Sequence, residues 1–196
     1  MTNKAKKSIY KICFIVGASI LVAAITVLVV WQCSISINAK KSQKYLETLG
    51  LIMPETKGAA LEERADNTMS VLSVDGKDFI GIIEMPRFSS KLPVGASWGE
   101  SSKHPCLFGG SLYDRTIKIG ATTQKGQYSF YREISVGDTL VFTDVQGNSY
   151  TYAIADLRYR EHADNEALNQ IPADLVLFVK NIYDFEYLII SCNITK

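Results

Sequence analysis

An uncharged apolar run near the N-terminus constrains this chain more than any other feature. Residues 12–31, ICFIVGASILVAAITVLVVW, contain no charged side chain. At about 1.5 Å per residue, a helix of this length covers a bilayer core of about 30 Å. We therefore predict a transmembrane helix over 12–31, with the short segment 1–11 on one side of the membrane and residues 32–196 on the other.

The lysines around this run predict its orientation. Four lysines precede it, the last of them Lys11, whereas the first cation after it is Lys40. The positive-inside rule then places the N-terminus in the cytoplasm and the rest of the chain outside the cell membrane. A cleaved signal peptide is the alternative. The run is longer than the usual apolar core of about 7–15 residues, and no small-residue cleavage pattern follows Trp31, so a retained anchor is preferred.

The net charge and the cysteine and histidine content limit which ligands and partners this chain is expected to bind. The chain has 21 Lys and Arg against 20 Asp and Glu, and four of the bases precede the apolar run, so the remainder is net acidic. Nucleic acid is therefore not an expected partner. No metal or cofactor site is predicted, since there are two histidines and no CxxC pair. Cys106 and Cys192 face an oxidising compartment, where they form either a disulfide or two buried free thiols.

Residues 32–70 have a helical character. Tyr45, Leu46 and Leu49 have the apolar spacing of a helix, and Gly50 and Pro54 are typical helix terminators. We predict a juxtamembrane helix followed by a short second helical piece.

From residue 71 to residue 196 the sequence is typical of a mainly β domain. Short runs rich in Val, Ile, Phe and Tyr alternate with turn residues. One or two helical turns are expected within 161–170. The predicted strands are 79–85, 116–120, 139–143, 149–154, 174–180 and 186–193, with hairpins joining the third to the fourth and the fifth to the sixth.

The order of three stretches resembles a sortase of class B type. These stretches are DFIGIIEMPRFSSKLPV (78–94), PCLFGGSLYD (105–114) and VGDTLVFTDVQGNSYTYAI (136–154). Sortases of this type are membrane-anchored cysteine transpeptidases of Gram-positive bacteria. The resemblance implies a closed eight-stranded antiparallel barrel with N-terminal helices.

The resemblance also implies three catalytic groups: a thiolate nucleophile, a histidine that transfers a proton, and an arginine that stabilises the oxyanion. The matching positions hold Thr122 in place of the histidine, Lys180 in place of the cysteine and Tyr187 in place of the arginine. Threonine is neither a base nor an acid near neutral pH. In this register the catalytic set is missing.

A second register makes Cys192 the nucleophile, because LIISC (188–192) also resembles a sortase strand that ends in its cysteine. His104 or His162 would then be its partner. Only residues 193–196 follow Cys192, too few for the return strand that closes the barrel, so the first register is preferred.

Lys180 has three possible roles in the preferred register. It could be a catalytic lysine paired with Ser111 or Thr122, it could bind an anionic or carbonyl group, or it could be solvated surface.

These observations support three hypotheses of function. The preferred one is a sortase-like pseudoenzyme, a non-catalytic accessory or binding module in pilus or cell-surface protein assembly at the cell wall. Its partner would be a pilin or surface-protein segment, or an active sortase. The alternatives are an active cysteine transpeptidase that uses Cys192, and a purely structural membrane element.

Overall fold

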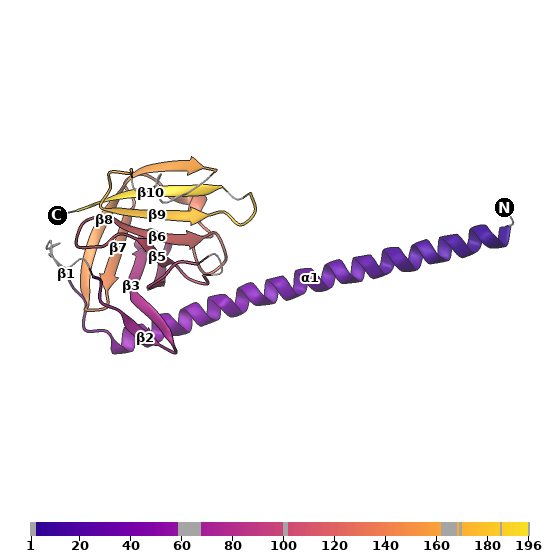
Figure 1. The fold of residues 1–196 in the computed structure, drawn as a ribbon, viewed down its shortest axis with the longest axis horizontal. Coiled ribbons are helices and arrows are strands. Elements are labelled where there is room, and N and C mark those ends of the chain that lie inside the picture. Colours follow the sequence, from indigo (N-terminus) through magenta and orange to yellow (C-terminus); the bar gives the residue numbers. More distant parts are fainter. Residues whose placement is uncertain are drawn as a thin grey trace. The chain divides into compact units, whose positions relative to one another are not determined.

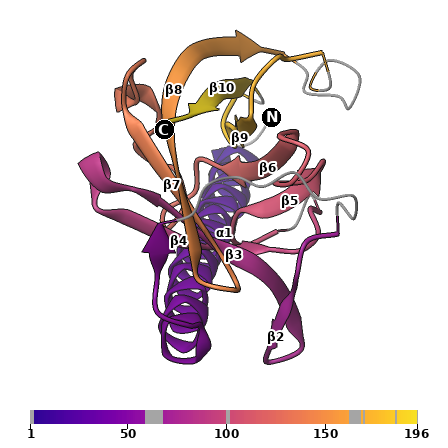
Figure 2. The ribbon, with the colours of Figure 1, turned by 90° about the vertical axis from the view of Figure 1, so that its left-hand side faces the viewer.

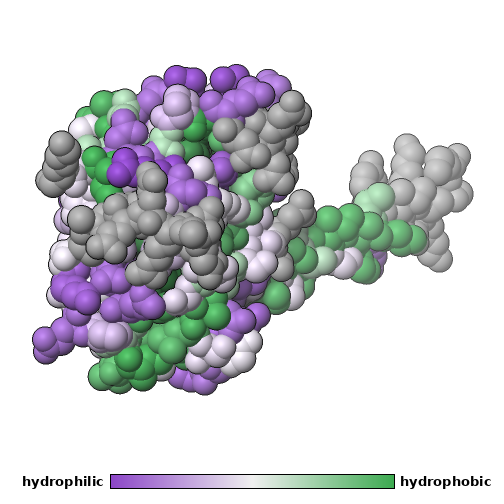
Figure 3. Space-filling model, turned by 60° about the vertical axis from the view of Figure 1, so that its left-hand side comes forward, coloured by the Kyte–Doolittle hydropathy of each residue, from purple (hydrophilic) through white to green (hydrophobic). Residues whose placement is uncertain are grey.

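The computed structural model describes residues 3–58, 68–99, 102–161, 168, 170–184 and 186–195. The chain forms two compact units, Met1–Ile37 and Asn38–Lys196. The first unit is the N-terminal part of a single helix, α1 (Asn3–Ile52) (Figure 1). This helix is long and apolar enough to cross a membrane, and the residues of its apolar run, 12–31, are exposed (Figure 3). The predicted N-terminal apolar helix is therefore present.

The second unit is mainly β, as predicted. Two 3₁₀ turns, η1 (Pro86–Phe88) and η2 (Tyr131–Glu133), interrupt the strands. The strands are β1 (Lys57–Gly58), β2 (Leu72–Val74), β3 (Lys77–Met85), β4 (Ser90–Gly95), β5 (Cys106–Gly109), β6 (Ile117–Thr122), β7 (Thr139–Asp144), β8 (Asn148–Arg160), β9 (Leu175–Lys180) and β10 (Tyr187–Ile194).

Eight of these strands close into a barrel, which confirms the predicted architecture. Their order around the ring is β8, β10, β9, β6, β5, β4 and β3, and β7 closes it by pairing with both β3 and β8. The long strand β8 bends from its pairing with β7 to its pairing with β10 (Figure 2). Strands β1 and β2 are additions to this ring. The ring is antiparallel except at β4–β5 and β6–β9, which are parallel.

The barrel interior holds the main core, and the outer face of β9 is also covered. Leu175, Leu177 and Val179 of β9 point into the interior core. Val176 and Phe178 pack on the outside in a separate apolar cluster. Both faces of β9 are thus buried, which explains why its sequence is continuously apolar rather than alternating.

The last turns of α1 pack on the barrel. Leu49 is fully buried in a cluster with Val74, Phe79 and Ile82, and Tyr45 and Leu46 lie beside it, so the predicted apolar face is confirmed. The helix ends at Ile52, two residues before Pro54, and Gly50 lies inside it.

The helical prediction for 32–70 is wrong beyond this point. Residues 57–58 form the short strand β1 instead. It pairs in parallel with the start of β8. The remainder of the predicted second helical piece, 59–67, lies outside the described residues, as does most of the predicted helical turn within 161–170.

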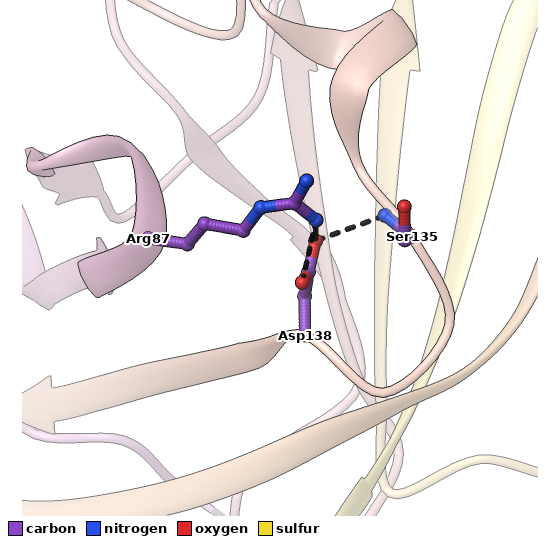
Figure 4. Close-up of polar contacts among 3 residues, drawn as sticks. All are labelled: Arg87, Ser135 and Asp138. Atoms are coloured by element: carbon purple, nitrogen blue, oxygen red, sulfur yellow. Dashed lines mark hydrogen bonds and ion pairs between the residues drawn. The ribbon is translucent and has the colours of Figure 1, made fainter.

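The GD pair at 137–138 has a structural role at the start of β7. Both Asp138 carboxylate oxygens accept hydrogen bonds from Nη1 of Arg87, at 2.8 Å each, and one also accepts from the backbone N–H of Ser135 at 2.9 Å (Figure 4). Gly137 has a φ of +92°, a conformation that glycine adopts without strain. Since Arg87 lies just after β3, this contact ties the two closing strands together and engages the guanidinium.

The hairpin from β7 to β8 turns on Asp144, which is buried. Its carboxylate accepts hydrogen bonds from the backbone N–H groups of Gln146 and Asn148, both at 2.9 Å. Gly147 adopts a φ of +82° in the same turn. The predicted hairpin is confirmed, although β8 continues six residues beyond its predicted end, to Arg160.

Barrel closure at β3–β7 predicts the effect of a single added methyl group. A β-carbon on Gly81 would lie 2.1 Å from the backbone oxygen of Thr143, whereas nothing lies within 4 Å of one on Gly109 in β5. We expect Gly81→Ala to lower the free energy of unfolding by about 2–3 kcal/mol. Gly109→Ala should change it by less than about 1 kcal/mol. Thermal unfolding of the two variants in detergent checks this, and equal losses would contradict it.

Candidate functional site

Three strand ends meet at one end of the barrel. Thr122 ends β6, Lys180 ends β9 and Tyr187 begins β10. Thr122 is the register partner of Lys180 on the parallel neighbour, and Lys180 is the register partner of Tyr187 on the antiparallel one. The fold therefore brings the three positions singled out in the sequence into one row across three adjacent strands. We call Thr122, Lys180 and Tyr187 the strand-end row.

The strand-end row lies on the outer face of the barrel. Ala121 and Val179 belong to the interior core, and side chains alternate along a strand, so Thr122 and Lys180 point outward. Thr122 is buried, while Lys180 and Tyr187 are half-buried. The Lys180 ammonium lies 5.8 Å from the centroid of the Tyr187 ring, within the range of a cation–π contact.

The residues that follow the row form a buried hydrogen-bond network. The Thr123 hydroxyl donates to Oδ1 of Asn181 at 3.4 Å, and Nδ2 of Asn181 donates to the hydroxyl of Tyr131 at 2.9 Å. The backbone N–H of Thr123 also donates to the carbonyl of Lys180 at 3.1 Å. Sequence reasoning missed Thr123 and Asn181. The only signal in the sequence was a pair of polar residues at each strand end, Thr122–Thr123 and Lys180–Asn181. Which residue of a pair points inward depends on the strand register, which the sequence does not show.

The strand-end row suits binding better than proton transfer. It offers a hydroxyl, an ammonium and a phenol ring, and a threonine hydroxyl neither takes nor gives a proton near neutral pH. The half-buried ammonium can bind a carbonyl or carboxylate oxygen, and the ring can pack on an apolar side chain. Among the described residues no hydrogen bond joins the Thr122 hydroxyl to Lys180.

Ser111 is far from Lys180, so a Ser/Lys dyad is wrong. Its backbone carbonyl accepts a hydrogen bond from the N–H of Thr116, which places it where β6 begins. Lys180 is level with the other end of β6, about 16 Å away at 3.3 Å per residue. The Ser111 hydroxyl instead accepts a hydrogen bond from the backbone N–H of Tyr113.

Cys192 lies in the barrel core. It is 0% exposed and pairs with Leu175, at the end of β9 opposite to Lys180. Burial raises the pKa of its thiol to about 12. The side chain belongs to the interior apolar cluster and does not open beside Thr122. A buried thiol with a raised pKa is a poor nucleophile.

His104 lies near Cys106 and not near Cys192. A β-carbon on Gly95 would be 2.8 Å from both Nε2 of His104 and Sγ of Cys106, so these two atoms lie within twice that distance of each other. Burial, and then the charge of Lys77, lower the pKa of His104 to about 4, while burial raises the pKa of Cys106. The pair is therefore a neutral imidazole and a protonated thiol. His162 lies outside the described residues.

Cys106 and Cys192 do not form a disulfide, and both are free thiols. They lie on β5 and β10, which β6 and β9 separate in the ring. At about 4.8 Å per strand their α-carbons are about 14 Å apart, beyond the reach of a disulfide. No cluster of three His, Cys, Asp or Glu that could hold a metal occurs in the part of the chain that the structure describes.

Comparison with known proteins identifies the fold. No family model and no curated protein matches the sequence. Among solved structures, the chain is similar to the pilus-related sortase C of Group B Streptococcus, with a TM-score of 0.54 and 20% identity over 84% of this chain and 91% of that one. Sortase C1 from Streptococcus suis aligns with a TM-score of 0.51 and 20% identity over 60% and 73% of the two chains. Sortase A from Corynebacterium diphtheriae aligns with a TM-score of 0.51 and 12% identity over 83% and 84%.

The closed barrel, its strand order and these similarities define the class of the domain. The chain has the sortase fold, preceded by one apolar helix that could span a membrane.

Core burial predicts the behaviour of Cys192. Replacing it by alanine removes a buried sulfur, so Cys192→Ala should lower the free energy of unfolding by about 1–2 kcal/mol. Cys33→Ala, at an exposed position of α1, should have no comparable effect. In the folded protein Cys192 should resist a water-soluble thiol reagent. Labelling of Cys192 as fast as that of Cys33 would contradict its burial.

The depressed pKa of His104 predicts a loss of stability in acid. Between its ordinary pKa of 6.5 and its folded pKa of about 4, the unfolded chain binds the proton more readily than the folded chain. The free energy of unfolding should therefore fall as the pH drops from 7 to 4, by up to about 1.4 kcal/mol per pH unit. Denaturant unfolding of the wild type and His104→Gln at several pH values checks this. The variant should have the shallower slope, and identical slopes would show that His104 is not responsible.

Proposed function

We propose that this chain is a membrane-anchored sortase-like protein without sortase catalysis, which binds a segment of a pilin or another surface protein, or an active sortase. On this proposal the barrel keeps a peptide-binding surface and has exchanged its reactive groups for binding groups.

The strand-end row is the observation that carries the proposal. The resemblance to sortases implies histidine, cysteine and arginine where this chain has Thr122, Lys180 and Tyr187. These three side chains lie in one row at the ends of three adjacent strands. Their closeness is what residues of one site require, and the residue types do not support acyl transfer.

The neighbouring network supports the same proposal. Asn181 is 4% exposed and Thr123 is 6% exposed, and their polar groups are engaged with each other and with Tyr131. These bonds stabilise the strand ends and engage the polar side chains of Thr123 and Asn181. A rigid surface with one ammonium and one aromatic ring favours non-covalent capture of a peptide, because little side-chain freedom is lost on binding.

We place the barrel outside the cell membrane, with the N-terminus in the cytoplasm. The four lysines before the apolar run support this orientation. We also propose a Gram-positive cell-wall setting and a class B type relationship, on the sequence stretches at 78–94, 105–114 and 136–154. The similar structures named above are of sortases A and C.

The alternative function, a transpeptidase that uses Cys192, has weaker support. Its thiol is buried, and among the described residues no imidazole lies on either strand that flanks β10. A purely structural role remains the third hypothesis, and peptide binding separates it from the first.

The test uses the full chain in detergent and fluorescent sorting-signal peptides. We expect saturable binding with no cleavage or transfer product by mass spectrometry. Tyr187→Ala should weaken binding about tenfold, as loss of a central aromatic contact does. Lys180→Ala should also weaken it.

Tyr159→Ala, which removes an exposed tyrosine of β8, is the matched control and should bind as the wild type does. Thiol-dependent cleavage that Cys192→Ala abolishes would overturn the proposal in favour of the transpeptidase. Absence of any peptide binding would favour the structural role.

A further inference from the structure

A second candidate site has none of the strand-end row among its lining residues. A cavity of about 640 Å³ opens between the last turns of α1, the turn from β2 to β3 and the residues on either side of the loop between β4 and β5. This volume is in the range of about 300–1,000 Å³ that ligand sites occupy. Lys41, Lys77, Trp98, Lys103 and His104 are among its lining residues.

The cavity is electropositive. Lys41, Lys77 and Lys103 line it, and Asp78 is the only carboxylate among the described residues that line it. The Asp78 carboxylate accepts a hydrogen bond from the hydroxyl of Ser73. None of the three lysines has an ion-pair partner within the described part of the chain, in contrast to Lys44, which pairs with Asp75 at 3.0 Å outside the cavity.

Two polar atoms at the cavity have no hydrogen-bond partner among the residues that the structure describes. Ser42 is only 3% exposed, and its hydroxyl is unpartnered, as is Nδ1 of His104. Leaving a buried polar group unpaired is unfavourable, so an acceptor that entered the cavity would gain from meeting the Ser42 hydroxyl. The lysines would attract an anionic ligand, and the two unpaired atoms would orient it through hydrogen bonds.

One wall of the cavity is aromatic. Trp98 and Tyr45 line it, and the Tyr45 ring lies 6.0 Å from the His104 ring, edge to face. Trp98 is held against Phe178, edge to face at 5.4 Å. Gly120 has no side chain to displace Trp98, since a β-carbon there would lie 2.6 Å from it. A small inorganic anion would leave this wall uncovered, whereas a peptide with an apolar residue beside a carboxylate would contact both sides.

We propose that this cavity binds an acidic peptide segment of a partner protein, with its carboxylate at Lys41 and Lys77 and an apolar side chain on Trp98. The site shares no residue with the strand-end row, although Trp98 and Tyr187 both pack on Phe178. It adds an electrostatic contact that sorting-signal binding at the row does not require.

The test follows Trp98 fluorescence in the full chain. The chain has two tryptophans, so a Trp31→Phe background leaves Trp98 as the only tryptophan, which can be excited selectively above the tyrosine absorption band. The probe is the blocked peptide Glu-Leu-Glu-Leu, compared with Gln-Leu-Gln-Leu and with inorganic phosphate. We expect saturable change with the acidic peptide, weakening as salt rises, and little with the other two.

Substitutions in the cavity test whether the acidic peptide binds there. Lys41→Gln combined with Lys77→Gln should weaken binding of the acidic peptide about tenfold, and Lys125→Gln, at an exposed lysine outside the cavity, should not. Ser42→Ala should weaken binding about threefold without loss of thermal stability, because it removes an unpaired buried hydroxyl.

Equal binding of the glutamine peptide, an undiminished affinity of the double lysine variant, or phosphate binding as tight as that of the acidic peptide would each overturn the proposal. Sorting-signal binding should survive the double lysine variant. A failure at this cavity is therefore distinguishable from a failure at the strand-end row.

Discussion

Closure of the barrel by β7 is the constraint on which the rest of the structure depends. This strand pairs with β3 on one side and with β8 on the other, so the ring has no free edge. Closure sets where β6, β9 and β10 lie, and therefore where their ends meet. The approach is so close at Gly81 that a single methyl group would collide with the backbone of Thr143. The contact between Arg87 and Asp138 supports the same junction from its outer end.

Closure also explains how the barrel can hold different residue types at its strand ends. The strands are held by core packing and backbone pairing, which do not depend on the residue at position 122 or 180. A threonine and a lysine can stand there without loss of the barrel. The buried contacts of Thr123, Asn181 and Tyr131 then secure the strand ends by hydrogen bonds. The scaffold and the chemistry of its site are thus separable in this chain.

The two proposed binding regions differ in their physics. The strand-end row has one ammonium beside an aromatic ring on a rigid sheet, and its contacts are short-range. The cavity has three exposed lysines with no ion-pair partner among the described residues, so its attraction for an acidic partner is stronger at low ionic strength. Trp98 separates the cavity from the outer face of β9, where it packs on Phe178. A partner could engage each region with a different segment.

The amino-acid sequence by itself determined the features that depend on local pattern. The apolar run, the apolar face at Tyr45, Leu46 and Leu49, the two predicted hairpins and the end of β9 at Lys180 are each written in consecutive residues or regular spacing. The prediction of a second helical piece fails at residues 57–58, which form β1, and the failure has a physical cause. A two-residue strand has no periodicity that a sequence could show, and β1 exists only because β8 is beside it.

Only the tertiary structure decided which distant side chains meet. It placed His104 near Cys106 instead of Cys192, and it separated Ser111 from Lys180 by the length of β6. It also turned Asn181 toward Tyr131, and it left the Ser42 hydroxyl at a cavity without a hydrogen-bond partner among the described residues. These pairings join segments far apart in the chain, and a shift of one residue in strand register reverses the face on which a side chain lies.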